Sequence, residues 1–493
     1  MRILRNIFAR SVPITLLLTL AAGLPALLCP GAIDRAGAQT TKPTILDPDL
    51  SVRQVVGSLV TPICLAFMGN RDILVLEKNT GQVKRFVNGT IMTVADLAVN
   101  FASERGLLGI ALHPNFPSNP SVYLYWTEST TGADTSVFAE TPLLGNRVDR
   151  FVWNGSTLVF AQNIIRLRAL QPDAGQVPRG NHNGGVLRFG PDKKLYILVG
   201  DVGRRGQLQN LPCGPTATCP GPIVQDDQFG GPAPDNAHLT GVVLRLNDDG
   251  TAPSDNPFFS AGAAIGGESG ANIQKIFAYG IRNGFGMAFD PISDLLWTQE
   301  NGDDSFDEIN LVMPGFNSGW IQIMGPAKKI KQYKEIETSA EFGGLQQLRW
   351  PPSNIADSAS EAKSSLFVLP GSHYSDPELS WKFSVAPGGI GFVKGRGLGV
   401  QFRGDLFVGA ATTRAAGGYL FRFKLTADRK ALALSHALED RVANNTTKYD
   451  LSESRRFLIG EDFGVTTDIQ TGPNGNLFVV SLSHGAIYEI RKR

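Results

Sequence analysis

A histidine and an aspartate at a definite spacing are the residues of this sequence best suited to proton transfer. His182 lies in the run Asn-His-Asn-Gly-Gly, and Asp201 follows nineteen residues later. Residues 186–199, between them, hold two apolar runs separated by a turn, which predicts a hairpin whose ends return to one edge. The two side chains would then be neighbours, and a histidine oriented by a carboxylate is the arrangement of a general base. The spacing also fits a structural histidine hydrogen-bonded near a turn.

Two further clusters carry charged and amide side chains. Residues 279–286, Tyr-Gly-Ile-Arg-Asn-Gly-Phe-Gly, contain Arg282 and Asn283, which suit an anionic or carbonyl group. The alternative is an arginine that caps backbone carbonyls. Residues 300–304, Glu-Asn-Gly-Asp-Asp, form an oxygen-rich turn that suits Ca²⁺. The alternative there is an acidic turn in contact with solvent.

The N-terminal residues predict export. Three arginines are followed by the apolar residues 11–29 and by the small residues 36–38, Ala-Gly-Ala. This is the pattern of a secretory signal peptide over residues 1–38, with an uncleaved membrane anchor as the alternative. Residues 39–55 are expected to form a linker, and no later stretch is long and apolar enough to span a bilayer. The mature protein is therefore expected to be secreted or periplasmic.

The cysteines and the charge balance narrow the class of protein. Cys213 and Cys219 lie close together in a Pro- and Gly-rich segment and are expected to form a disulfide in an oxidising compartment, with two free thiols as the alternative. Cys64 lies in an apolar strand pattern and is expected to be a buried thiol.

Lys and Arg number 46 and Asp and Glu 45, so no basic excess is present and nucleic-acid binding is not expected.

The elements that position these residues come from a repeat. A short apolar strand, a turn and a second apolar strand recur six times, and most copies are followed by a third strand. The copies begin at Leu65, Ile110, Val186, Met287, Ile390 and Asp468. Six such meanders predict an all-β chain, a six-bladed β-propeller of four-stranded antiparallel blades over residues 56–493. Unrelated hairpins in two β-sandwiches are the alternative.

Five segments in order carry a family resemblance. They are GLLGIALHPNF, NHNGG with LYILVGD, VVLRLNDDGTAPSDNPF, YGIRNGFGMAFDP and ENGDDSFDEINLVMPGFNSGW. The chain from about Val56 onward resembles the soluble glucose/sorbosone dehydrogenases. The resemblance implies a six-bladed propeller that uses pyrroloquinoline quinone (PQQ) and Ca²⁺ in carbohydrate metabolism.

The resemblance also implies the catalytic roles. His182 would take the proton from the anomeric hydroxyl of a sugar while hydride passes to the quinone. Asp201 would orient His182. Arg282 would be both a catalytic residue and one of the residues that contact the quinone.

The cofactor positions follow from the same resemblance. Glu104 and Asn283 would lie at the quinone, and the carbonyls of Gly302 and Asp303 would hold the Ca²⁺.

This sequence departs from the family pattern at the cofactor. Glu104 stands where the family's glucose dehydrogenases have Gln, and Asp303 where they have Pro. Their lysine before the closing strand of the fifth copy has no counterpart, since only Arg414 is basic there. Val465 and Thr467 stand where they have two arginines. Each lost charge-assisted hydrogen bond weakens binding of the tricarboxylate by about 1.5–3 kcal/mol.

Three functions are consistent with the sequence. The first is an exported quinoprotein-type dehydrogenase that oxidises an aldose, a small-molecule sugar, at the anomeric hydroxyl. The second is a propeller of the same family that has lost the quinone and binds Ca²⁺ and a carbohydrate or protein partner. The third is a Ca²⁺-dependent propeller lactonase or hydrolase.

Overall fold

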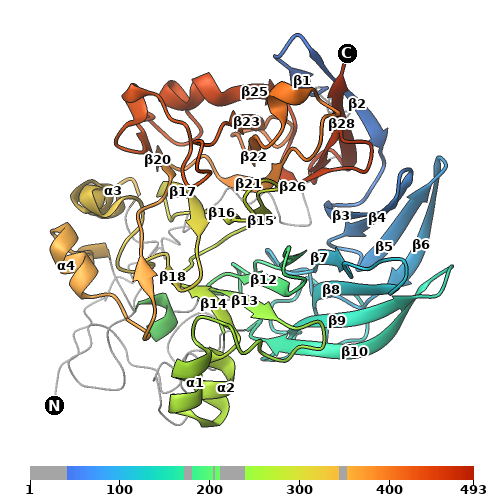
Figure 1. Cartoon of the computed structure of the whole chain (residues 1–493), viewed down its shortest axis with the longest axis horizontal. Coiled ribbons are helices and arrows are strands. Elements are labelled where there is room, and N and C mark those ends of the chain that lie inside the picture. The colour runs from blue at the N-terminus through green and yellow to red at the C-terminus, as the bar shows by residue number, and fades with distance from the viewer. Residues whose placement is uncertain (1–41, 171–179, 204–205, 211–238, 343–351) are drawn as a thin grey trace, which may run out of the picture.

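Six β-sheets arranged around a common centre make the chain a six-bladed β-propeller (Figure 1). The structure is a computed structural model that describes residues 42–170, 180–203, 206–210, 239–342 and 352–493. In this part of the chain, each sheet contains at least four antiparallel strands that follow one another from the centre outward, and three of the sheets carry one or two further short strands at the edge. The all-β class and the six blades expected from the repeat are therefore confirmed.

The first three blades are built from strands that are nearly consecutive in the sequence. The first blade comprises β3 (Pro62–Gly69), β4 (Asp72–Glu77), β5 (Gln82–Val87) and β6 (Thr90–Asp96). The second comprises β7 (Leu107–Leu112), β8 (Ser121–Thr127), β9 (Asn146–Trp153) and β10 (Leu158–Leu167). The third comprises β11 (Val186–Phe189), β12 (Leu195–Val199), β13 (Val242–Leu246) and β14 (Ile276–Tyr279). The third sheet is extended by two short parallel strands, β18 (Phe316–Asn317) and β19 (His373–Tyr374).

The last three blades recruit strands from further along the chain. The fourth blade comprises β15 (Gly286–Phe289), β16 (Leu296–Glu300), β17 (Ser305–Val312), β20 (Leu379–Phe383) and β24 (Val442–Ala443). The fifth comprises β21 (Pro387–Phe392), β22 (Leu406–Ala410), β23 (Tyr419–Phe423), β25 (Leu458–Glu461) and β1 (Thr44–Ile45). The sixth comprises β26 (Thr466–Thr471), β27 (Leu477–Ser481), β28 (Ala486–Lys492) and β2 (Leu50–Val56).

Helices lie in the connections between strands. The α-helices are α1 (Phe259–Ile265), α2 (Gly267–Ile273), α3 (Ile330–Glu337) and α4 (Ala359–Ser364). Short 3₁₀ turns cover Gln207–Gln209, Ala327–Lys329, Pro352–Asn354, Val400–Phe402, His436–Leu438 and Ser452–Phe457. Helix α3 packs against β17 and so contributes to the fourth blade from outside its sheet.

The sequence of each strand reflects its distance from the centre. The second strands of the blades, such as β12 and β22, are buried along their whole length because both faces pack against neighbouring blades. The outermost strand β6 is mostly exposed, and its sequence is correspondingly mixed. Apolar side chains between adjacent blades therefore make the cores that hold the ring together.

The ring is closed by a strand that was expected to be linker. Residues 39–55 were predicted to connect the signal peptide to the propeller, but Leu50–Val56 form β2, the outer strand of the sixth blade. Strand β2 pairs antiparallel with β28, with Leu50 opposite Lys492 and Val52 opposite Ile490. Leu50 is fully buried, which explains why this short segment joins the fold.

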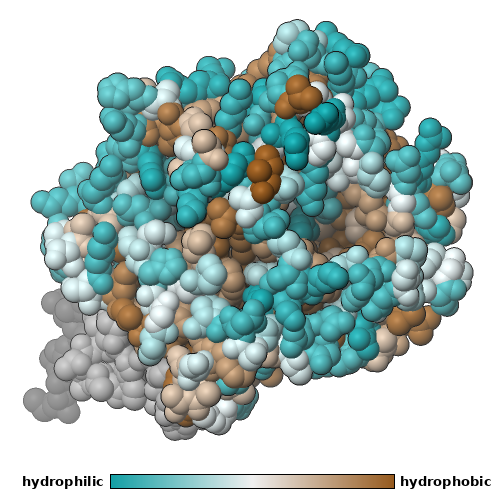
Figure 2. All heavy atoms as spheres, viewed as in Figure 1, coloured by the Kyte–Doolittle hydropathy of each residue, from teal (hydrophilic) through white to brown (hydrophobic). Residues whose placement is uncertain are grey.

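The inner strands bring the candidate residues to one end of the ring. Strands β7, β11 and β15 begin just after Glu104, His182 and Arg282, and these inner strands lie next to one another. All blades run from inner to outer strand in the same order, so the starts of their inner strands share one end. In the view of Figure 2, hydrophobic residues show within a hollow near the middle of the ring, surrounded by a mostly hydrophilic surface.

Some sequence predictions fall outside the described residues. These are the signal peptide, residues 1–38, and the pair Cys213 and Cys219. Cys64 is described and is a buried free cysteine whose pKa is raised to about 12, first by burial and then by Asp468. Within the described ranges, no helix has the length and apolar character needed to cross a membrane.

Candidate active site at one end of the ring

The predicted contact between His182 and Asp201 is present. The Nδ1 atom of His182 lies 2.7 Å from Oδ1 of Asp201, and both side chains are buried. The hairpin of β11 and β12 brings them together, as the spacing predicts, because its two ends lie at the same edge. A carboxylate at Nδ1 favours the proton on that nitrogen, which leaves Nε2 as the basic atom. This half of the site has the geometry of a general base.

Asp201 is held in place by two further donors. The indole Nε1–H of Trp320 donates to Oδ2 of Asp201 at 2.9 Å, and the backbone N–H of Gly203 donates to Oδ1 at 2.7 Å. Trp320 has no role that could be recognised in the sequence, although it lies in one of the segments that carry the resemblance. No local spacing relates it to Asp201, since 119 residues separate the two.

Glu104 links the base to the amide at the next blade. Its Oε2 accepts the backbone N–H of His182 at 2.6 Å, and the Nδ2 group of Asn283 lies 3.5 Å from both carboxylate oxygens. Lys78 lies nearby, and burial lowers its pKa to about 8 although the charge of Glu104 opposes this. Glu104 therefore joins the starts of β11 and β15 from the second blade, where a glutamine would carry no charge.

The side chain of Arg282 binds to the neighbouring turn. Its guanidinium donates to the carbonyl of Asn301 at 2.9 Å and forms an ion pair with Asp303. Burial would lower the pKa of Arg282, but the charges of Asp303 and Asp201 raise it above its usual value. The alternative that this arginine caps a carbonyl is thus correct in part, and the side chain also neutralises a buried carboxylate.

The turn after β16 is shaped by Asp307. Its carboxylate accepts the backbone N–H groups of Gly302 at 2.9 Å, Val385 at 2.7 Å and Ala386 at 2.8 Å. Gly302 has no space for a side chain, because a Cβ atom there would lie 1.9 Å from the carbonyl oxygen of Ser305. The predicted metal turn is therefore tightly folded and buried, which is different from the solvated acidic turn considered as the alternative.

The donor set of this turn fits a hard divalent cation. Oδ1 of Asn283, Oδ1 of Asn301 and Oδ2 of Asp303 are buried and accept no hydrogen bond from the described residues. Buried oxygens without partners are costly, and Ca²⁺ takes carboxylate, amide and carbonyl oxygens as ligands. No group of three or more His, Cys, Asp or Glu side chains in the described ranges has the geometry of a metal site, so amide and backbone oxygens would have to contribute.

The residues at the predicted quinone site provide only some of the donors that the carboxylates of the quinone need. The buried Nε of Arg282 has no acceptor among the described residues, so it offers a hydrogen bond to an anion. Position 467 supplies only a buried hydroxyl that has no hydrogen-bond partner in the described part of the chain, and Val465 supplies no side-chain donor. Of the positions compared with the family pattern, Arg282 supplies a cation to a tricarboxylate, whereas positions 465 and 467 supply none.

The structure adds two buried acids to the site. Glu300 accepts the backbone N–H of Arg282 at 2.5 Å and the hydroxyl of Ser318 at 2.8 Å, and burial raises its pKa to about 7. Glu337, at the end of α3, accepts the N–H of Asp304 and the hydroxyl of Ser305. Burial, and then the charge of Asp303, raises the pKa of Glu337 to about 8. The helix that carries Glu337 had no recognisable link to the site in the sequence.

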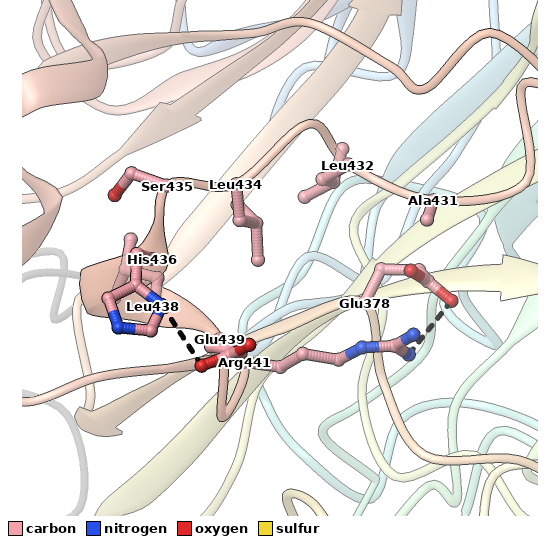
Figure 3. Close-up of a pocket in the computed structure, with 9 residues that line it drawn as sticks. All are labelled: Glu378, Ala431, Leu432, Leu434, Ser435, His436, Leu438, Glu439 and Arg441. Carbon is pink, nitrogen blue, oxygen red and sulfur yellow. Dashed lines mark hydrogen bonds and ion pairs between the residues drawn. The ribbon is translucent and has the colours of Figure 1, made fainter.

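A cavity of about 290 Å³ lies elsewhere, between the start of β20 and residues 431–441 (Figure 3). Ion pairs flank it, from Arg441 to Glu378 at 3.2 Å and from His436 to Glu439 at 3.1 Å. It contains none of the predicted site residues, so we do not assign it to the candidate active site.

Comparison with known proteins shows to which protein family the chain belongs. Residues 59–368 match the family model described as glucose/sorbosone dehydrogenase, and the chain therefore belongs to this family. The family resemblance inferred from the five sequence segments is confirmed.

Individual relatives are distant. Quinoprotein glucose dehydrogenase B of Acinetobacter calcoaceticus is 31% identical over 285 residues, which cover 55% of this chain and 52% of that protein. Aldose sugar dehydrogenase YliI of Escherichia coli (strain K12) is 27% identical over 276 residues, covering 55% and 62%. The chain thus spans about half to three fifths of the length of these relatives.

A solved structure supports the fold over nearly the whole chain. The PQQ-bound form of an aldose sugar dehydrogenase from Streptomyces coelicolor has a TM-score of 0.55 and 23% identity, and covers 90% of this chain and 98% of that chain.

Proposed function

We propose that this protein is an exported quinoprotein-type dehydrogenase that oxidises an aldose at the anomeric hydroxyl. The observation that carries the proposal is the buried pair of His182 and Asp201 at the end of the ring where Arg282 and Asn283 also lie. Membership of the glucose/sorbosone dehydrogenase family supports the substrate class.

The protein's part in the reaction is to hold the sugar and move one proton. Nε2 of His182 takes the proton of the anomeric hydroxyl as the C1–H bond breaks, and Asp201 stabilises the imidazolium that forms. PQQ, when bound, supplies the acceptor for the hydride, and the sugar leaves as its lactone. Arg282 and Asn283 would hold the quinone, and the turn of Gly302 and Asp303 would hold the Ca²⁺.

The test is oxidation of a panel of aldoses by purified protein supplied with PQQ, Ca²⁺ and an artificial electron acceptor. His182 has a backbone φ of +60°, which asparagine adopts more readily than alanine, so His182→Asn is the suitable variant. Loss of the base should lower the rate by about 10²–10⁴-fold. His436→Ala is the matched control, because that side chain is 93% exposed and lies in another cavity. Equal activity of both variants would refute the assignment.

The neutral residues at positions 465 and 467 favour a second candidate. A propeller of this family without these cations would bind Ca²⁺ and a carbohydrate or protein partner but no quinone. The double variant Val465→Arg, Thr467→Arg separates the candidates by equilibrium titration with PQQ. PQQ-dependent turnover by wild type that rises in the variant supports the dehydrogenase, whereas no binding of PQQ by wild type supports the second candidate.

A further inference from the structure

Trp320 hydrogen-bonds one of the two carboxylate oxygens of Asp201, and His182 contacts the other. Its indole N–H occupies Oδ2 at 2.9 Å, so that Oδ1 is left for His182 at 2.7 Å and for the N–H of Gly203 at 2.7 Å. A carboxylate with donors fixed on both oxygens cannot rotate about its bond to Cβ without breaking one of these contacts. The direction of the lone pair that faces His182 is thereby set.

The same tryptophan also contacts the cofactor side of the site. The guanidinium carbon of Arg282 lies 5.3 Å from the centre of the Trp320 ring, within the range of a cation–π contact. The backbone N–H of Asp201 donates to the carbonyl of Arg282 at 2.7 Å. The indole thus lies against both the residue that orients the base and the arginine that would contact the quinone.

The backbone around Trp320 is anchored on both sides. Its N–H donates to the carbonyl of Gly280 at 3.0 Å, and its carbonyl accepts from Nδ2 of Asn210 at 2.7 Å. The side chain is completely buried. Because Gly280 lies two residues before Arg282, the backbone of Trp320 is tied directly to the segment that carries Arg282.

We propose that Trp320 is the positioning residue of this site, which holds Asp201 so that His182 keeps its proton on Nδ1 and presents a basic Nε2. The expected effect on turnover rests on the function proposed above, but the effect on the imidazole is a property of the protein alone. The two are therefore measured separately.

The test compares two tryptophan-to-phenylalanine variants. Trp320→Phe retains an aromatic ring beside Arg282 but removes the N–H donated to Asp201. Trp381→Phe is the matched control, because Trp381 is equally buried and its Nε1 has no hydrogen-bond partner in the described residues. Folding of both variants is compared by thermal unfolding.

The first readout is ¹⁵N NMR of histidine-labelled protein without cofactor, with the His182 signals assigned from His182→Asn. Wild type and Trp381→Phe should show the Nδ1–H tautomer, and Trp320→Phe a mixture of tautomers. The same tautomer in all three proteins would overturn the proposal. In the proteins supplied with PQQ and Ca²⁺, Trp320→Phe should lower kcat about tenfold or more, with a smaller change in KM. Altered tautomers without aldose oxidation in wild type would refute the dehydrogenase and leave the positioning role standing.

A second measurement applies if Trp320→Phe does not fold. Asp201→Asn should move the indole Nε1–H resonance of one tryptophan, that of Trp320, while the other five of the chain's six stay in place. If no indole signal moves, Trp320 does not hold Asp201 and the proposal is wrong.

Discussion

Buried acids around the Asp303 turn decide how this site responds to pH. Glu300 and Glu337 both lie in the protein interior, and burial raises their pKa values to about 7 and about 8. Each acid accepts hydrogen bonds from backbone or hydroxyl groups, and for Glu300 the charge of Arg282 only partly offsets the effect of burial. A carboxyl with a raised pKa takes up a proton on folding, so the stability that it contributes is lost as the pH rises towards that pKa.

Glu337→Gln should remove part of this pH dependence. Between pH 4.5 and about 8 the folded protein holds the Glu337 proton and the unfolded chain does not, so the free energy of unfolding falls across this window. The amide cannot ionise, and at pH 8.5 the variant should be more stable than wild type by an amount on the order of 1–3 kcal/mol. Denaturant unfolding in a chelator at pH 5.5 and 8.5 measures this.

The control for this prediction is Glu335→Gln, on the same helix but exposed. It should leave the difference between the two pH values unchanged. A parallel loss of stability in wild type and Glu337→Gln would show that Glu337 does not titrate in this range.

Single elements of this fold depend on partners that are distant in sequence. Strand β2 has exposed residues at Arg53 and Gln54 and lies at the N-terminal edge of the described chain, yet it completes the sixth blade beside β28. Its contribution comes from burial of its ends, Leu50 and Val56, against the blade core. A propeller gains stability from such closure because the pairing joins the two ends of the ring.

Leu50→Ala should therefore destabilise the whole ring. Removing a fully buried leucine side chain costs about 2–5 kcal/mol, depending on how far the neighbours relax. Denaturant unfolding should show a lower midpoint for Leu50→Ala and little change for Gln54→Ala, the exposed position on the same strand. If both variants are equally stable, β2 does not hold the ring closed.

At the scale of the whole molecule, the site is assembled by the ring. Glu104, His182 and Arg282 precede inner strands of three successive blades, and the Asp303 turn belongs to the third of these. Each of these blades supplies one part of the candidate site, and none of the parts is complete alone. Binding at the site should therefore stabilise the fold as a whole, because the ligand binds only when the blades are assembled.

Ca²⁺ should raise the melting temperature. At a concentration about 100 times its dissociation constant, a ligand that binds only the folded state adds about 2.7 kcal/mol. Thermal unfolding in millimolar Ca²⁺ and in chelator should differ, and Asp303→Asn should reduce the difference because it replaces a buried carboxylate whose Oδ2 accepts no hydrogen bond from the described residues. Asp249→Asn, at an exposed turn, serves as control. The same melting temperature in Ca²⁺ and chelator would exclude a cation site.

The sequence by itself determined the parts that depend on neighbouring residues. Strand–turn–strand repeats predict six blades, because alternation and turn residues act over a few positions. The contact of His182 with Asp201 follows from the closure of one hairpin, β11 with β12. The tertiary structure alone decided which side chains from distant parts of the chain meet at the site. Trp320 hydrogen-bonds Asp201 across 119 residues of sequence, and Glu337 comes from a helix outside the sheets. The physical reason is that a hydrogen bond between blades depends on how the blades pack, and no period or spacing in the chain records that packing.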